Sequence, residues 1–163
     1  MNGFLPKSWA PDGSRLLPQD PTNYFGAMIA FWLTALYLVV ITVRSCIHLF
    51  SADGGAQSIA TIDTNVAGGN NIIAIFGQWG ATQLLLALLL WVLLLRYRGL
   101  LPLVIVILLI EPLFRALSGH LKTVETIGTA PGAALNWFAV PILAVLLYLA
   151  LCPARVSTDS SHT

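Results

Sequence analysis

Charged residues are scarce in this sequence. Eight Lys and Arg with seven Asp and Glu make up 9% of the 163 residues, whereas a soluble domain carries about 25%. Hydrophobic residues make up 57%, and the mean hydropathy is +0.82. The net charge of +1 provides no basic surface for nucleic acid. This composition excludes a nucleic-acid-binding protein and predicts that membrane lipid is the main partner.

Motifs that carry chemistry are also scarce. The sequence contains no Cys-x-x-Cys pair, no glycine-rich phosphate loop, no Gly-x-Ser-x-Gly elbow and no pair of histidines at metal-ligand spacing. Because no catalytic constellation is complete, the sequence favours a protein that is not an enzyme, and it predicts no metal site. No cofactor is predicted from the motifs of the sequence. The two cysteines, Cys46 and Cys152, are expected about 30 Å apart, which excludes a disulfide between them.

What the sequence does contain is four long apolar runs. They cover about residues 24–43, 72–95, 100–118 and 133–151, close to the roughly 20 residues that a helix needs to cross a bilayer. We therefore predict an all-α integral membrane protein, a bundle of four transmembrane helices within 24–152. Residues 1–23 are expected to form an irregular, proline-bearing arm and 153–163 a short polar tail. Gly77-x-x-Gly80 is interpreted as a packing notch.

The orientation follows from the basic residues of the short loops. Arg96 and Arg98 mark the link between the second and third runs as cytoplasmic. Both termini are then cytoplasmic, and the loop that contains Asp53 and Asp63 but no Lys or Arg lies outside. The predicted location is the cell membrane, with several spans, and the inner membrane if the source is bacterial.

Glu111 and Arg115 lie inside the third apolar run. Residues four apart share one face of a helix, so the two side chains can pair. A charge at the centre of a span costs about 2.5–3.5 kcal/mol unless it finds a polar partner. Pro112 cannot donate a hydrogen bond to the carbonyl of Leu108, which adds an acceptor beside the acid. The pair therefore marks a polar site within the membrane.

Counting about 1.5 Å per residue places other polar residues near the depth of this pair. These residues suggest a small polar pocket in the outer leaflet, covered by the loop that contains Asp53 and Asp63. The alternative is an internal ion pair of Glu111 with Arg115 or Arg44 that the two amides hold and that fixes helix packing. For His48, a position at the membrane interface is expected rather than a metal site. The candidate ligand-binding residues are Arg44, His48, Gln78, Glu111, Arg115 and Asn136.

The stretch from Glu111-Pro112 to Arg115, followed by Pro131-Gly132 and Asn136, resembles small four-helix DoxX-like bacterial membrane proteins of unassigned function. The resemblance covers about the last two-thirds of the chain, and the proline-bearing arm departs from it. Some members of the wider group are linked to quinone-coupled redox chemistry. The resemblance therefore implies a quinone or a lipid head group as ligand.

Two functions follow from these observations. The first is an accessory or scaffold subunit of a membrane complex, which agrees with the missing catalytic motifs. The alternative is a membrane enzyme or carrier that binds a quinone or lipid head group in the outer-leaflet pocket. In that case Glu111 would handle protons, and Arg115 or Arg44 would hold an anion. A protein partner and a homo-oligomer both remain open.

Overall fold

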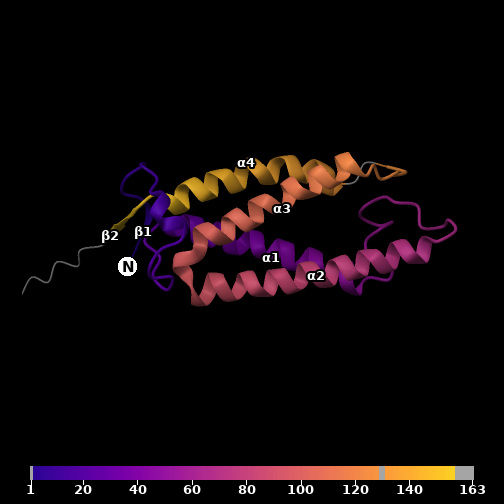
Figure 1. Ribbon diagram of the computed structural model, residues 1–163, viewed down its shortest axis with the longest axis horizontal. Coiled ribbons are helices and arrows are strands. Elements are labelled where there is room, and N and C mark those ends of the chain that lie inside the picture. Colours follow the sequence, from indigo (N-terminus) through magenta and orange to yellow (C-terminus); the bar gives the residue numbers. More distant parts are fainter. Residues whose placement is uncertain (1, 129–130, 157–163) are drawn as a thin grey trace, which may run out of the picture.

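The computed structural model describes the backbone of residues 2–128 and 131–156 and the side chains of residues 3–128 and 137–154. Within these ranges the chain forms four helices (Figure 1), and the predicted all-α character is confirmed. Three helical segments are long and apolar enough to cross a membrane: Met28–Phe50, Gly69–Arg96 and Arg98–Leu121. A shorter apolar helix covers Trp137–Leu151. The helices are α1 (Met28–Phe50), α2 (Gly69–Arg96), α3 (Leu101–Leu121) and α4 (Pro131–Leu151), and a 3-10 turn, Arg98–Leu100, precedes α3.

The ends of α1 differ from the predicted run of 24–43. The helix begins only at Met28, because Gly26 bridges to Pro153 and Ala27 is extended at the N-cap. A Cβ atom on Gly26 would lie 2.4 Å from the carbonyl oxygen of Ala150, so only glycine fits there. At the other end α1 continues to Phe50, since a charged residue such as Arg44 does not itself terminate a helix.

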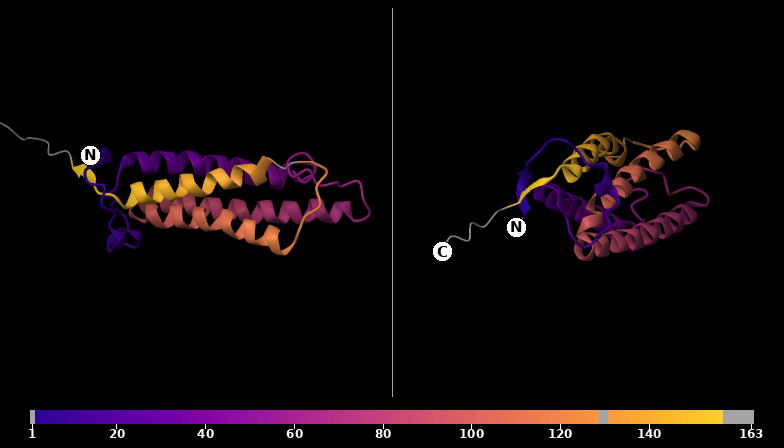
Figure 2. Two further views of the ribbon diagram at one scale, coloured as in Figure 1. Left: turned by 90° about the horizontal axis from the view of Figure 1, so that it is seen from above. Right: turned by 60° about the vertical axis from the view of Figure 1, so that its left-hand side comes forward.

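The helices form two antiparallel hairpins. Helix α1 runs beside α2, and α3 runs beside α4 (Figure 1). Helices α2 and α3 meet at the tight turn around Gly99 and separate toward their other ends, as both Figure 1 and the left view of Figure 2 show. The hairpins are therefore close together at the turn and further apart at the opposite end.

Apolar side chains from all four helices form the core. The leucine-rich half of α2 divides between two faces, because Leu90 and Leu94 are buried whereas Leu85 and Leu89 are exposed. Exposed leucines on a long apolar helix suit contact with lipid. The largest fully buried core side chains are Leu38, Leu90, Leu94, Leu101, Ile105 and Leu143.

The amino-terminal arm is more ordered than the sequence predicted. Strand β1 (Asn2–Pro6) pairs antiparallel with β2 (Ala154–Val156), and a 3-10 helix covers Gly13–Leu16. The backbone N–H of Lys7 donates to the Pro153 carbonyl at 2.7 Å. The closely spaced prolines exclude a long helix but not a short strand. The spacing of the prolines led to the expectation of an irregular arm, and the strand was not foreseen because its partner lies at the other end of the chain.

Candidate functional site

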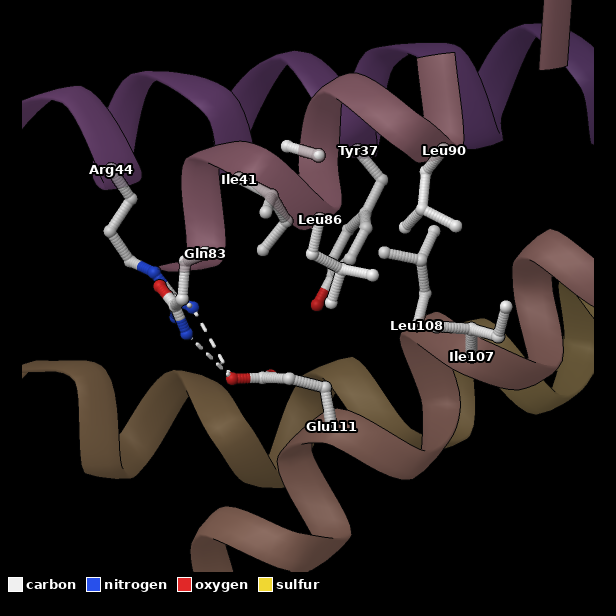
Figure 3. Close-up of a pocket in the computed structure, with 10 residues that line it drawn as sticks. Tyr37, Ile41, Arg44, Gln83, Leu86, Leu90, Ile107, Leu108 and Glu111 are labelled. Atoms are coloured by element: carbon white, nitrogen blue, oxygen red, sulfur yellow. Dashed lines mark hydrogen bonds and ion pairs between the residues drawn. The ribbon is translucent and has the colours of Figure 1, made fainter. Parts of the chain in front are cut away.

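Glu111 connects three helices through its carboxylate (Figure 3). Its Oε1 accepts a hydrogen bond from Nε2 of Gln83 on α2 at 3.1 Å. The same oxygen lies 3.5 Å from Nη2 of Arg44 on α1. Arg44 also donates from Nη2 to Oε1 of Gln83 at 3.2 Å, which closes a triangle of polar contacts. One acidic side chain of α3 thus ties its own hairpin to the α1–α2 hairpin.

Arg115 adds a second guanidinium one helical turn beyond Glu111. It donates from Nη2 to Oε2 of Glu111, so the i,i+4 pair expected from the sequence is present. Arg44 also lies over the ring of Trp79, with 5.8 Å from its guanidinium carbon to the ring centroid. One carboxylate therefore stands between two guanidinium groups, and the cluster carries an excess positive charge. Within the described residues, the buried Nε atoms of Arg44 and Arg115 have no hydrogen-bond partner.

Two cavities border this cluster. The smaller has a volume of about 20 Å³ and is lined by Tyr37, Ile41, Leu108 and other side chains of Figure 3, which is room for about one water molecule. The larger is an open cleft of about 530 Å³ between α2 and α3. The side chains of Arg44, Glu111 and Arg115 are 24%, 25% and 30% exposed, so the cluster lies at a wall rather than in the core. The α2–α3 cleft is lined by Trp79, Thr82, Gln83, Leu86, Ile107, Ile110, Glu111, Phe114, Arg115 and Ser118.

His48 was expected in the pocket and lies elsewhere. Its Nδ1 is 2.7 Å from the carbonyl oxygen of Gly54, in the loop that follows α1. Its ring packs against Trp79 and Phe76, with centroid distances of 4.6 and 5.8 Å. With only 3% of its surface exposed, His48 joins α1 and α2 to the loop and does not reach Glu111.

Of the two predicted amide residues, the structure describes the side chain of Gln78, which does not join the cluster. Gln78 is exposed on α2 and is not among the side chains that line the α2–α3 cleft. Asn136 belongs to α4, but its side chain lies outside the described residues. Of the six candidates, the structure brings together Arg44, Glu111 and Arg115.

Gln83 is the site residue that sequence reasoning missed. The signal that could have found it is the tight turn, because Gln83 and Glu111 are equally far in sequence from Tyr97. In two antiparallel helices that a short turn joins, such as α2 and α3, residues equidistant from the turn lie at the same height. Both side chains then lie where α2 and α3 face each other, and the Glu111 carboxylate accepts a hydrogen bond from the Gln83 amide.

The loop between α1 and α2 is held by its own hydrogen bonds. The Asp53 carboxylate accepts the backbone N–H groups of Ser58 at 2.7 Å and Gly55 at 2.9 Å. These bonds favour the ionised carboxylate and lower the pKa of Asp53 below its usual range. Thr61 contacts the loop before α4, because its carbonyl oxygen accepts the N–H of Ile127 at 2.8 Å. None of the residues that line the α2–α3 cleft comes from the Asp53–Asp63 loop that was expected to cover it.

Three long apolar helices indicate a multi-pass membrane protein. In the part of the chain that the structure describes, no group of three His, Cys, Asp or Glu residues is placed to hold a metal ion. Comparisons with protein-family models, curated proteins and solved structures found no match for this chain. The resemblance to DoxX-like proteins stays a prediction.

Proposed function

We propose that this chain is a cell-membrane protein with four spans and with both termini on the cytoplasmic side. The 23 residues of α1 and the 21 of α4 give lengths of about 35 and 32 Å, enough for a core of about 30 Å. The paired strands β1 and β2 lie at the same end of the molecule as the α2–α3 turn (Figure 1). Arg96 and Arg98 at that turn make this end the basic, cytoplasmic one.

This orientation predicts which surface residues a membrane-impermeant thiol reagent reaches. Ala67 and Ala10 are both exposed, in the loop before α2 and in the arm. In a chain with Cys46 and Cys152 replaced by alanine, Ala67→Cys is expected to react in intact cells. Ala10→Cys should react only after permeabilisation, and the cysteine-free chain should not react. The reverse labelling would overturn the orientation.

We further propose that the α2–α3 cleft binds an amphipathic molecule with an anionic head group. The observation that carries this proposal is an open cleft of about 530 Å³ whose wall includes Glu111 and Arg115, with the guanidinium of Arg44 in contact with Glu111 from α1. That volume lies within the roughly 300–1,000 Å³ typical of ligand sites. Leu86, Ile107 and Phe114 supply apolar contacts for a hydrocarbon portion.

The charges of the cluster favour an anion over a neutral quinone. Both oxygens of Glu111 accept from cationic or amide donors, so Glu111 acts as an anchor for the two guanidinium groups. Proton handling by Glu111 is therefore no part of the proposal. An anionic head group would balance the excess positive charge, whereas quinone carbonyls are neutral acceptors and would leave it in place.

Native mass spectrometry of the gently extracted protein tests this proposal. We expect a bound lipid-sized anion whose retention depends on Arg115, so that Arg115→Gln reduces its retention about tenfold or more, as for the loss of a charged hydrogen bond. Lys122→Gln is the matched control, because Lys122 is exposed just beyond the end of α3. Equal retention by both variants would contradict the proposal. A bound quinone would show a neutral ligand in place of the proposed anion.

A scaffold subunit is the second candidate function. The observation in its favour is a row of exposed apolar side chains along one side of α2: Leu85, Leu88, Leu89 and Val92. Such a row suits a protein partner or a second copy of the chain as well as it suits lipid. In the same spectra, a stoichiometric protein partner together with an empty cleft would favour this function.

A further inference from the structure

A third pocket lies at the opposite end of the molecule from the loop that holds Asp53. Its volume is about 620 Å³, and it forms where the arm passes the ends of α1 and α2. The wall combines apolar side chains with two arginines, so it is itself amphipathic. Its lining residues are Thr22, Asn23, Tyr24, Phe25, Met28, Phe31, Leu95, Arg96 and Arg98.

The two arginines of this pocket are held by aromatic rings rather than by acids. The guanidinium carbon of Arg98 lies 5.3 Å from the centroid of the Phe31 ring, and that of Arg96 lies 5.5 Å from the Tyr97 ring. Among the described residues, neither arginine forms an ion pair. Stacking on an aromatic face leaves the N–H groups of a guanidinium available for a phosphate.

The acidic residue of the adjacent arm segment does not neutralise these arginines. The Asp20 carboxylate accepts from the backbone N–H of Thr22 at 2.9 Å and from Nδ2 of Asn23 at 2.6 Å. The Thr22 hydroxyl also donates to this carboxylate at 2.5 Å, and these bonds, that of the hydroxyl first, lower the pKa of Asp20. Among the described residues no ion pair joins Asp20 to Arg96 or Arg98. The pocket therefore keeps the positive charge of two arginines.

Gly99 holds the arm against the helices and so positions one wall of the pocket. Its N–H donates to the Pro21 carbonyl at 2.8 Å. A Cβ atom at this position would lie 2.8 Å from the carbonyl oxygens of both Pro21 and Asn23, so the close approach requires glycine. Residues Thr22 and Asn23 are thereby held at the pocket wall that Leu95 completes from α2.

We propose that this pocket binds an anionic phospholipid of the adjacent leaflet. The phosphate would contact Arg96 and Arg98, and the glycerol and acyl portions would lie along Met28, Phe31 and Leu95. The amphipathic lining and the position at the basic ends of two spans fit a lipid, because basic residues next to a span attract anionic head groups. This site is separate from the α2–α3 cleft and shares no lining residue with it.

Lipid titration of the full-length purified protein, followed by native mass spectrometry, tests the inference. The wild-type chain is expected to retain phosphatidylglycerol in preference to phosphatidylcholine. The double variant Arg96→Gln/Arg98→Gln should bind phosphatidylglycerol about 30-fold more weakly, which corresponds to about a fivefold loss for each arginine. The control Lys7→Gln/Lys122→Gln removes the same charge outside the pocket and should stay within about twofold of wild type.

Two further experiments distinguish lipid binding in the pocket from other kinds of binding. Leu95→Trp narrows the pocket without changing the charge, and Leu95 is 56% exposed, so the variant should fold. It is expected to weaken phosphatidylglycerol binding severalfold. Unchanged binding in this variant, or an equal loss in the lysine control, would overturn the proposal. Displacement of the lipid by millimolar inorganic phosphate would show a free-phosphate site instead, which also overturns it.

Discussion

Replacement of Glu111 by alanine is expected to destabilise the folded protein by about 3 kcal/mol or more. The change would leave the guanidinium groups of Arg44 and Arg115 together without the carboxylate that both contact. Breaking a buried ion pair by removing one partner costs about 3–5 kcal/mol, because an uncompensated charge remains. The partial exposure of the cluster places the expected loss at the lower end. Denaturation in mixed micelles measures this loss of stability.

Two controls separate the loss of charge balance from the loss of a side chain. Glu125→Ala removes an exposed carboxylate and should change stability by less than about 0.5 kcal/mol. The triple variant Arg44→Met/Glu111→Leu/Arg115→Met should be about as stable as wild type, because apolar replacement of a whole ionic cluster is often neutral. That variant should nevertheless lose the ligand of the α2–α3 cleft. If the triple variant retains the ligand, the cluster is only a packing device.

Gly80→Ala is expected to separate α1 from α2 and to cost about 1–3 kcal/mol. A Cβ atom on Gly80 would lie 2.6 Å from the backbone nitrogen of Leu49 and 2.7 Å from the carbonyl carbon of His48. These are backbone atoms of α1, so no side-chain rotation relieves the overlap. Gly80→Leu should be more damaging still, and mixed-micelle denaturation compares the variants.

Gly77 provides the matched control for Gly80. At Gly77 the nearest atom to an added Cβ is the His48 carbonyl oxygen at 4.0 Å, which is ordinary contact. Gly77→Ala should therefore be tolerated or be stabilising by up to about 1 kcal/mol through helix propensity. Equal stability of the two alanine variants would refute the role of Gly80. Because Gly80 sets the distance between the helices that carry Arg44 and Gln83, its variants should also weaken ligand binding.

The outcome for the two glutamines shows how far sequence reasoning can place a polar site. Counting residues from the expected start of the second run selected Gln78, whereas Gln83 contacts Glu111, because Gln78 lies about 7.5 Å further from the turn than Gln83. Five residues correspond to about 140° of rotation around a helix axis, so the two amides point in different directions. The height of a residue depends on the rise per residue and on the boundary from which counting begins, whereas its direction depends on which face the neighbouring helix covers. His48 lies away from the cluster for a related reason, since its ring contacts the Gly54 carbonyl.

The sequence by itself determined the features that depend on neighbouring residues. Apolar runs of sufficient length specify long helices and a membrane environment, and the spacing of Glu111 and Arg115 specifies their pairing. Only the tertiary structure decided the contacts between distant segments. These are the pairing of β1 with β2, the close approach at Gly80, the choice of Gln83 and the cleft between α2 and α3. The physical reason is that a leucine-rich helix can bury similar apolar area in several rotations, so a few specific contacts with distant residues select one of them.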